Sequence, residues 1–129
     1  MKLAFFMPMI PPTVTSQQKG VNWSAKRFYE KSELKDARSK FTAYLGHHKP
    51  STPETGAVRL VTKWCFPITG KHVNGEYKTS RPDTDNSVKL LKDVMTEIGF
   101  WTDDAQVASE VTEKFWAYTP GIYVEIESI

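Results

Sequence analysis

Residues 57–66 alternate strictly between two kinds of side chain, and this pattern limits the fold more than any other in the sequence. One face carries Val58, Leu60, Thr62, Trp64 and Phe66, while Arg59 and Lys63 lie on the other. A period of two residues is that of a strand with one buried face. The segment from Ala57 to Phe66 is therefore predicted as a half-buried strand.

Two amphipathic helices are predicted on either side of this strand. The first begins at Ser32, which can cap it, and runs to about Leu45 before Gly46. The second runs from about Thr84 to Ile98, with its buried stripe at Val88, Leu91, Met95 and Ile98. Gly99 follows, where a left-handed residue is expected to end the helix.

Shorter strands are predicted at both ends of the chain. Leu3 to Met9 reads as a first strand, and Asp104 to Tyr118 as a later one. Thr119-Pro120-Gly121 predicts a turn into a last alternating strand from Ile122, so that the two final strands form a hairpin. Residues 11–31 and 67–82 are predicted as loops, and the length of the second favours a functional or mobile segment.

These elements predict an α+β fold, with one mixed sheet and two main helices packed on it. A chain of 129 residues suits a single domain, 1–129. Cys65 is the only cysteine, so no disulfide forms within the chain, and a reducing, cytoplasmic location is expected. No apolar run approaches the roughly 20 residues of a membrane span, and residues 1–10 lack the features of a signal peptide.

The charges are unevenly distributed along the sequence. Residues 1–81 contain 14 basic and 5 acidic side chains, whereas residues 82–129 contain 3 basic and 10 acidic ones. A basic part is typical of polyanion binding and an acidic part of divalent-cation binding. Two solvated faces that neutralise each other explain the same charges.

Acidic residues gather at the start of the second predicted helix. If the chain is still extended there, Asp83 and Asp85 point the same way and could share one cation. Magnesium needs only a few carboxylates beside water and phosphate oxygens, and Asp103-Asp104 supplies a third, with one of the pair facing the metal. An EF-hand is excluded, because Val88 stands where that loop requires glycine.

The same residues also have a structural explanation. Asp, Thr and Asn are ordinary N-cap residues, and carboxylates suit the positive end of a helix dipole. Asp85, Lys89 and Asp93 are spaced four residues apart, as in common surface ion pairs. Asp103-Asp104 could be only a polar turn.

A longer set of residues resembles one family. The segment Arg81-Pro82-Asp83-Thr84-Asp85-Asn86, then Lys89, then Lys92-Asp93, then Gly99 to Val107 with Asp103-Asp104-Ala105-Gln106, is similar to the RusA family of Holliday junction resolvases. The family pattern is roughly P-D-x-D-N-x-x-K followed by D-D-x-Q-V. The match is strong over residues 81–107 and continues more weakly to the end of the chain.

The resemblance implies a magnesium-dependent endodeoxyribonuclease, usually a homodimer, that nicks four-way DNA junctions in pairs, with manganese as a substitute ion. The family's catalytic and metal-binding aspartates fall on Asp83, Asp85 and Asp104, and its essential lysine on Lys89. A metal-activated water would then hydrolyse the phosphodiester. Family members occur in bacteria, often in phage or prophage genomes.

Basic side chains outside this motif are the candidates for contacts with DNA phosphates. They are Lys19, Lys26, Arg27, Lys71, Lys78 and Arg81. Trp23 and Tyr29 are candidates for stacking on bases, with core packing as the alternative. Two other functions stay open: a broader nuclease for flaps and forks, and a DNA-binding module without catalysis.

Overall fold

A computed structural model gives the fold and describes residues 1–13, 19–22, 27–30 and 32–129. The strands are β1 (Lys2–Met7), β2 (Lys19–Asn22), β3 (Arg27–Glu30), β4 (Val58–Pro67), β5 (Val107–Ala117) and β6 (Gly121–Ser128). The helices are α1 (Ser32–Gly46), α2 (Thr84–Ile98) and the short 3-10 helix η1 (Asp104–Gln106). The α+β class predicted from the sequence is confirmed.

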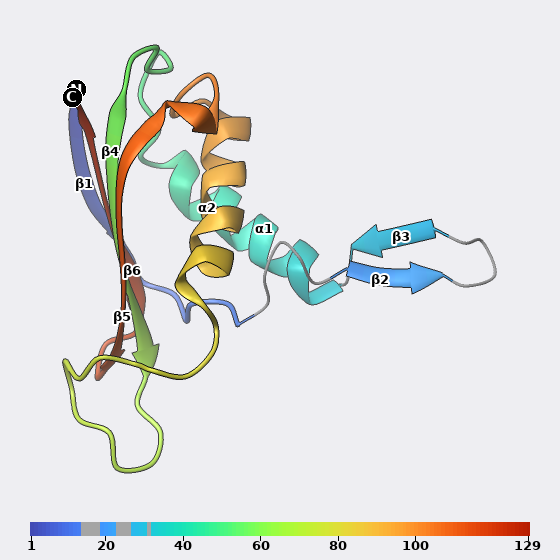
Figure 1. The fold of residues 1–129 in the computed structure, drawn as a ribbon, viewed down its shortest axis with the longest axis vertical. Coiled ribbons are helices and arrows are strands. Elements are labelled where there is room, and N and C mark those ends of the chain that lie inside the picture. The colour runs from blue at the N-terminus through green and yellow to red at the C-terminus, as the bar shows by residue number, and fades with distance from the viewer. Residues whose placement is uncertain (14–18, 23–26, 31) are drawn as a thin grey trace.

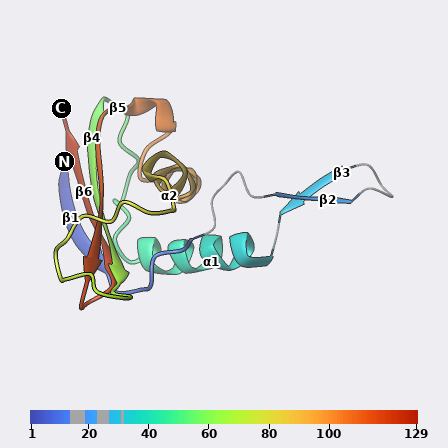
Figure 2. The ribbon, with the colours of Figure 1, turned by 60° about the horizontal axis from the view of Figure 1, so that its bottom comes forward.

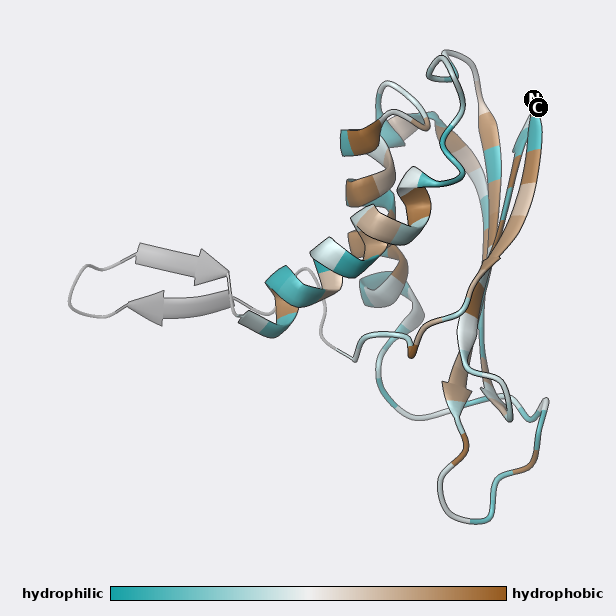
Figure 3. Ribbon diagram, turned by 180° about the vertical axis from the view of Figure 1, so that it is seen from behind, coloured by the Kyte–Doolittle hydropathy of each residue, from teal (hydrophilic) through white to brown (hydrophobic). Residues whose placement is uncertain are grey.

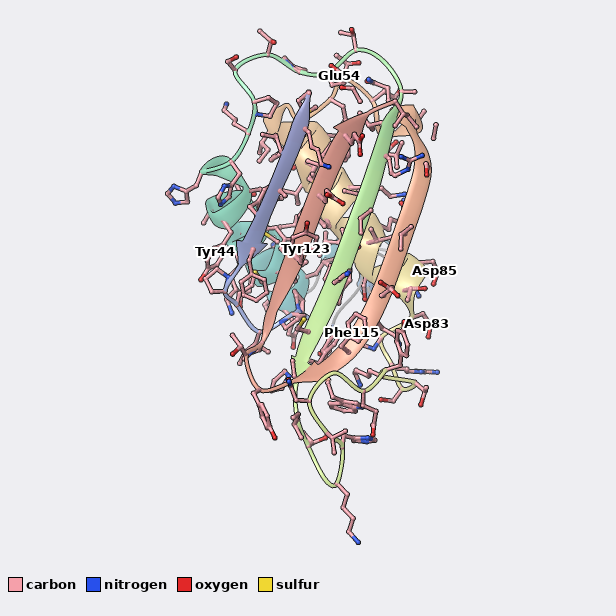
Figure 4. All side chains as sticks on the ribbon, turned by 90° about the vertical axis from the view of Figure 1, so that its left-hand side faces the viewer. Tyr44, Glu54, Asp83, Asp85, Phe115 and Tyr123 are labelled. Atoms are coloured by element: carbon pink, nitrogen blue, oxygen red, sulfur yellow. The ribbon has the colours of Figure 1, made fainter. Side chains whose placement is uncertain are left out.

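The main sheet has four strands in the order β1-β6-β4-β5. β4 is parallel to β5 and antiparallel to β6, and β6 is antiparallel to β1. Both helices lie against one face of this sheet, and the two chain ends meet at one end of it (Figures 1 and 2). Figure 4 shows the opposite face, which neither α1 nor α2 covers.

The core lies between the sheet and the two helices. Its largest fully buried side chains include Trp64 of β4, Phe41 of α1, and Phe100 and Trp101 after α2. The inward face of β4 is the one that the alternation predicts, since residues 58, 60, 62, 64 and 66 are all buried. Figure 3 shows apolar and polar residues alternating around both helices, as expected for helices with one buried side.

The bounds of α2 agree with the predicted ones at both ends. Gly99 has the left-handed φ of 97°, and its N–H donates to Met95 O at 3.2 Å. Phe100 N–H also donates to Met95 O, at 2.9 Å. These bonds satisfy carbonyl groups that the end of the helix would otherwise leave unpaired. Neither long helix of the described ranges has the length and apolar character of a membrane span.

The predicted hairpin of the last two strands is wrong. The turn at residues 119–121 does connect β5 to β6, but β4 lies between them and pairs with both. Alternation shows which face of a strand is buried, but it does not show which strands are neighbours. β4 is an inner strand that pairs with β6 along one edge and with β5 along the other.

Two further boundaries differ from the predictions. The strand expected from Asp104 begins only at Val107, because Asp103 and Gln106 form a capping box around η1. Residues 11–31, predicted as a loop, contain the antiparallel pair β2–β3. Strands of four residues are too short for a two-residue period to be recognised in the sequence.

Candidate functional site

The start of α2 holds the first two acidic candidates. Asp83 is the N-cap residue and is still extended, with φ −72° and ψ 147°, whereas Asp85 already lies in the first helical turn. The carbonyl of Asp83 accepts a hydrogen bond from Ser87 N–H at 3.1 Å, but its carboxylate makes no capping bond. The carboxylate is therefore available for another partner.

The carboxylates of Asp83 and Asp85 are both exposed. Because Asp85 is already helical, the extended geometry that would point both side chains the same way is not formed. Figure 4 shows Asp83 and Asp85 beside each other at the edge of the molecule nearest β5. Lys89, one turn further along α2, is also exposed. Within the described ranges, no salt bridge involves Asp83, Asp85 or Lys89, so the ion pairs that their spacing suggests do not form. The surface-ion-pair explanation of these residues thus finds no support in the geometry.

Lys114 of β5 holds the chain segment that leads into this site. Its ammonium group donates hydrogen bonds to Ser80 O at 2.7 Å and to Pro82 O at 2.6 Å. Lys114 is not among the residues predicted for the site. A signal was present, because Lys114 lies in the same two-residue phase as the buried Trp116, where an apolar side chain is expected.

The end of the loop before α2 pairs with the free edge of β5. Lys78 N–H donates to Lys114 O at 2.9 Å, and Trp116 N–H donates to Glu76 O at 2.9 Å. Gly75 N–H donates to Trp116 O at 2.8 Å. Much of the predicted loop 67–82 is therefore fixed to the sheet, close to the acidic residues.

Asp104 lies at the opposite end of α2. The helix has 15 residues, and a rise of 1.5 Å per residue separates its ends by about 22 Å. Figure 1 shows η1, which contains Asp104, beyond the C-terminal end of α2. The structure thus places Asp83 and Asp85 at one end of α2 and Asp104 at the other, and no cluster of three metal-ligating side chains occurs in the described part of one chain.

Gln106 fixes the turn that carries Asp104. Its side-chain N–H groups donate to Glu54 O and to Gly56 O, both at 2.8 Å. Its side-chain oxygen accepts from the backbone N–H of Thr102 and of Asp103, both at 2.9 Å. The carboxylate of Asp103 accepts from Ala105 N–H at 2.8 Å and has a structural role, whereas Asp104 forms no salt bridge in the described ranges.

The structure separates the basic candidates of the 67–82 loop into two kinds. Lys71 and Arg81 are exposed. The ammonium of Lys78 lies 4.2 Å from the ring centre of Trp116 and 5.2 Å from that of Phe66, and it donates to Ser80 Oγ at 2.6 Å. Burial and the nearby Lys114 charge lower the pKa of Lys78. Lys71 and Arg81 are therefore better placed than Lys78 to contact phosphates.

The earlier basic and aromatic candidates fall in a different part of the chain. Lys26 and Trp23 lie outside the described residues. For Lys19, Arg27 and Tyr29 the structure gives the backbone of β2 and β3 but not the side chains. Their predicted contacts with DNA stay predictions.

Comparisons with known proteins bear on this geometry. The family model for endodeoxyribonuclease RusA matches residues 9–127. A crossover junction endodeoxyribonuclease from Lactococcus phage r1t is 28% identical over 109 residues, which cover 83% of each chain. An uncharacterised protein, YqaN, of Bacillus subtilis (strain 168) is 30% identical over 93 residues, or 64% of this chain and 65% of its own.

The matched range contains the acidic start of α2, Lys89 and η1, together with β4, β5 and all of β6 but its last residue, whereas β1 lies outside it. The family resemblance seen in the sequence is thereby confirmed. The chain belongs to the endodeoxyribonuclease RusA family and is an enzyme that cleaves phosphodiester bonds of DNA.

Proposed function

We propose that the protein is a magnesium-dependent resolvase that cuts four-way DNA junctions by paired, symmetric nicks and acts as a homodimer. The observation that carries the proposal is the pair of exposed carboxylates at the start of α2, Asp83 and Asp85, which no other described side chain neutralises. The phage relative named as a crossover junction endodeoxyribonuclease supports the choice of DNA substrate. It also supports an origin in a phage or prophage genome, with action in the bacterial cytoplasm.

The residues present fit a magnesium ion. Proteins bind this ion through one or two carboxylates, with water and substrate phosphate oxygens as the remaining ligands. Asp83 keeps its carboxylate out of the helix cap, and Asp85 lies beside it. When bound, the ion would lower the pKa of a water molecule and offset charge on the phosphate under attack.

Asp104 is assigned to the same site through a second copy of the chain. About 22 Å of helix separates Asp104 from Asp83 and Asp85 within one chain. A two-fold axis that sets two α2 helices antiparallel places the C-terminal end of each beside the N-terminal end of the other. Each site would then combine Asp83 and Asp85 of one chain with Asp104 of the other.

The remaining residues receive roles that match their positions. Lys89 is one helical turn beyond Asp85 and faces solvent, so its ammonium can orient the attacking water or stabilise the developing negative charge. Lys71 and Arg81, on the segment that leads to Asp83, would hold the DNA backbone. Two sites related by a two-fold axis also match a junction that has two equivalent strands to cut.

The test is cleavage of an end-labelled four-way junction beside a linear duplex and a flap of the same sequences. Each substrate is incubated with magnesium, with manganese and with EDTA, using the wild type and Asp83→Asn. We expect paired, ligatable nicks in the junction alone, lost with EDTA and with the variant. The wild type and the variant should bind the junction equally well, because the change leaves the basic loop intact.

Two other results would replace the proposal. Equal cutting of flap and junction would indicate a nuclease of broader structural selectivity. Tight binding to the junction without cutting in either metal would indicate a DNA-binding module that has lost catalysis.

A further inference from the structure

A stacked pair of aromatic rings lies beside the proposed site and is not used by it. The rings of Tyr77 and Phe115 have their centres 4.9 Å apart and are tilted by 26°. Phe115 belongs to β5, on the sheet face that no helix covers, and Figure 4 shows it at the same end of that strand as Asp83. Tyr77 is 62% exposed, although it packs on Phe115.

The ring of Tyr77 is fixed from several directions. Its backbone forms a bridge to Phe115, and the neighbouring residues Glu76 and Lys78 bond to the edge of β5. Its hydroxyl donates to Glu113 Oε2 at 3.0 Å, which raises the pKa of Tyr77 and keeps the phenol neutral at ordinary pH. One side of the ring is thus held by Phe115, while much of the ring stays open to solvent.

Tyr118 offers a useful contrast at the same end of the sheet. It is 80% exposed, and its ring stacks on no other ring in the described ranges. A ring without such support must lose conformational freedom when it binds, whereas a ring that is already fixed loses little. Exposure alone therefore does not single out Tyr77; its fixed orientation does.

The chain segment that carries Tyr77 is mostly basic, although the carboxylate of Glu113 lies at the tyrosine hydroxyl. The segment 67–82 carries three basic side chains and one acidic one, Glu76. Tyr77 is six residues from Asp83, so the two lie within about 20 Å even if the chain between them is extended. That distance corresponds to about six stacked nucleotides or fewer along one strand.

We propose that Tyr77, supported by Phe115, is a stacking site for an unpaired nucleobase of the DNA strand whose phosphate reaches Asp83. The base would add a third ring to the stacked pair, and Lys71 and Arg81 would hold the phosphates on either side of it. The bases of a four-way junction can all pair, but a pair at the branch point is less enclosed by continuous stacking than one inside a duplex and costs less to open, so this contact favours branched DNA over linear duplex. The proposal deepens the proposed function and rests on it for the identity of the strand.

The experiment measures binding without cleavage, by fluorescence anisotropy of labelled DNA in EDTA. It compares the wild type with Tyr77→Leu, which removes the ring, and with Tyr77→Phe, which keeps the ring and loses only the hydroxyl. Tyr118→Leu is the matched control for removal of an exposed tyrosine. Thermal unfolding of each variant checks that the chain is folded.

We expect Tyr77→Leu to weaken binding to the four-way junction by about 5- to 150-fold, the usual effect of removing one stacked base contact. Binding to linear duplex should change by less than about twofold, and Tyr118→Leu should bind both DNAs as the wild type does. Tyr77→Phe keeps the stack on Phe115 but loses the bond to Glu113, so it should retain most of the affinity for the junction. A series of junctions, each with one abasic position near the branch point, identifies the base. At one position, the wild type and Tyr77→Leu should bind with equal affinity.

Several results would overturn the stacking site. Unchanged junction binding by Tyr77→Leu would do so, as would an equal loss on junction and duplex, or an abasic series in which the difference persists at every position. If the wild type still cuts junctions in magnesium, such a result removes the stacking site and leaves the proposed function intact. If the wild type never cuts junctions but Tyr77→Leu binds them more weakly, the stacking site stands and the resolvase activity is excluded.

Discussion

Asp83 occupies a position where a carboxylate normally accepts a hydrogen bond from the first turn of a helix, yet its side chain accepts none. Asp85 is in the same turn, so two negative charges face the positive end of the helix dipole without a described basic partner. The dipole offsets part of their mutual repulsion. A bound cation would offset the remaining repulsion between the two carboxylates. The pair therefore favours cation binding more than it stabilises α2.

We expect Asp83→Asn and Asp85→Asn each to reduce cleavage to the level seen with EDTA while leaving the fold intact. Asparagine is as good an N-cap as aspartate, and substitutions of exposed residues usually change stability by less than about 0.5 kcal/mol. Asp93→Asn is the matched control on the same helix. The assay is junction cleavage in magnesium, with urea unfolding of each variant. Retained activity would remove the tested residue from the metal site.

Lys114 links the sheet to the site through two carbonyl groups. We expect Lys114→Met to lower the free energy of unfolding by about 1–3 kcal/mol, because Ser80 O and Pro82 O each lose a charged donor. The magnesium concentration for half-maximal cleavage should rise, since the chain before Asp83 is no longer held. Both quantities are measured on the same preparation, by urea unfolding and by magnesium titration of the cleavage rate.

Lys92→Met is the control for loss of a lysine near α2. Lys92 pairs with Glu110 at 2.9 Å, and partly exposed pairs of this kind contribute about 0–1 kcal/mol. Lys92→Met should lower the free energy of unfolding by no more than about 1 kcal/mol, and it should leave the magnesium requirement of cleavage unchanged. Equal effects of the two substitutions would show that Lys114 does not position the site.

At the scale of elements, the sequence predicts what local signals determine. α2 agrees at both ends because Asp83 directly precedes it and Gly99 directly follows it, each within a few residues of its apolar stripe. The inward face of β4 follows from alternation alone. The neighbours of β4 do not, because strand order depends on contacts between residues far apart in the chain, and the predicted hairpin failed for this reason.

In the candidate site too, local sequence signals were recognised and contacts between distant residues were not. Asp83 and Asp85 were expected to point the same way if the chain stayed extended through both, but the helix begins at Thr84, so that condition is not met and their shared site stays a prediction. Asp104 is separated from them by the length of a helix. A sequence motif gives the order and spacing of residues along the chain, but it does not give their distances in space. Lys114 and Tyr77 were missed because their partners lie more than 30 residues away.

Alanine substitutions at two glycines, one in β6 and one in α1, should change the free energy of unfolding in opposite directions. At Gly121, the start of β6, a Cβ atom would lie 2.0 Å from Phe6 Cζ and 2.7 Å from Met7 O. We expect Gly121→Ala to destabilise the protein by about 2 kcal/mol or more, since the backbone of β1 cannot move away without loss of pairing. At Gly46 a Cβ meets nothing within 4 Å, so Gly46→Ala should stabilise by about 0.5–1 kcal/mol.

Urea unfolding of the two alanine variants measures the difference directly. Similar free energies of unfolding for both would contradict the close approach of β6 to β1 at Gly121. The comparison tests the register between these strands, in which Phe6 pairs with Tyr123 and Met7 with Ile122.

At the scale of the whole molecule, the opposed charges of the sequence meet at one place. The basic segment 67–82 pairs with β5 and leads directly into the acidic start of α2. Three basic side chains and two exposed carboxylates therefore share one stretch of the chain, as the proposed contact with DNA beside a metal site requires. Among the three candidate aspartates, Asp104 lies away from this stretch in a single chain, at the other end of α2.

Mixing two inactive variants tests whether a second chain supplies Asp104. In a heterodimer of Asp85→Asn with Asp104→Asn, one site contains both substitutions. The other site combines Asp83 and Asp85 of the second variant with Asp104 of the first, so it is intact. We expect the mixture, after subunit exchange, to nick one strand of the junction, although each variant alone is inactive.

The matched control is a mixture of Asp83→Asn with Asp85→Asn, whose substitutions fall at the same end of α2. Each site of that heterodimer contains one substituted aspartate under the shared arrangement, so the mixture should stay inactive. If each site were built within one chain, both mixtures would be inactive, because every chain would carry its own defect. Recovery of cleavage in the first mixture and not in the second therefore distinguishes a site shared between two chains from a site built within one chain. A shared site is the arrangement expected when the two α2 helices of the dimer lie antiparallel.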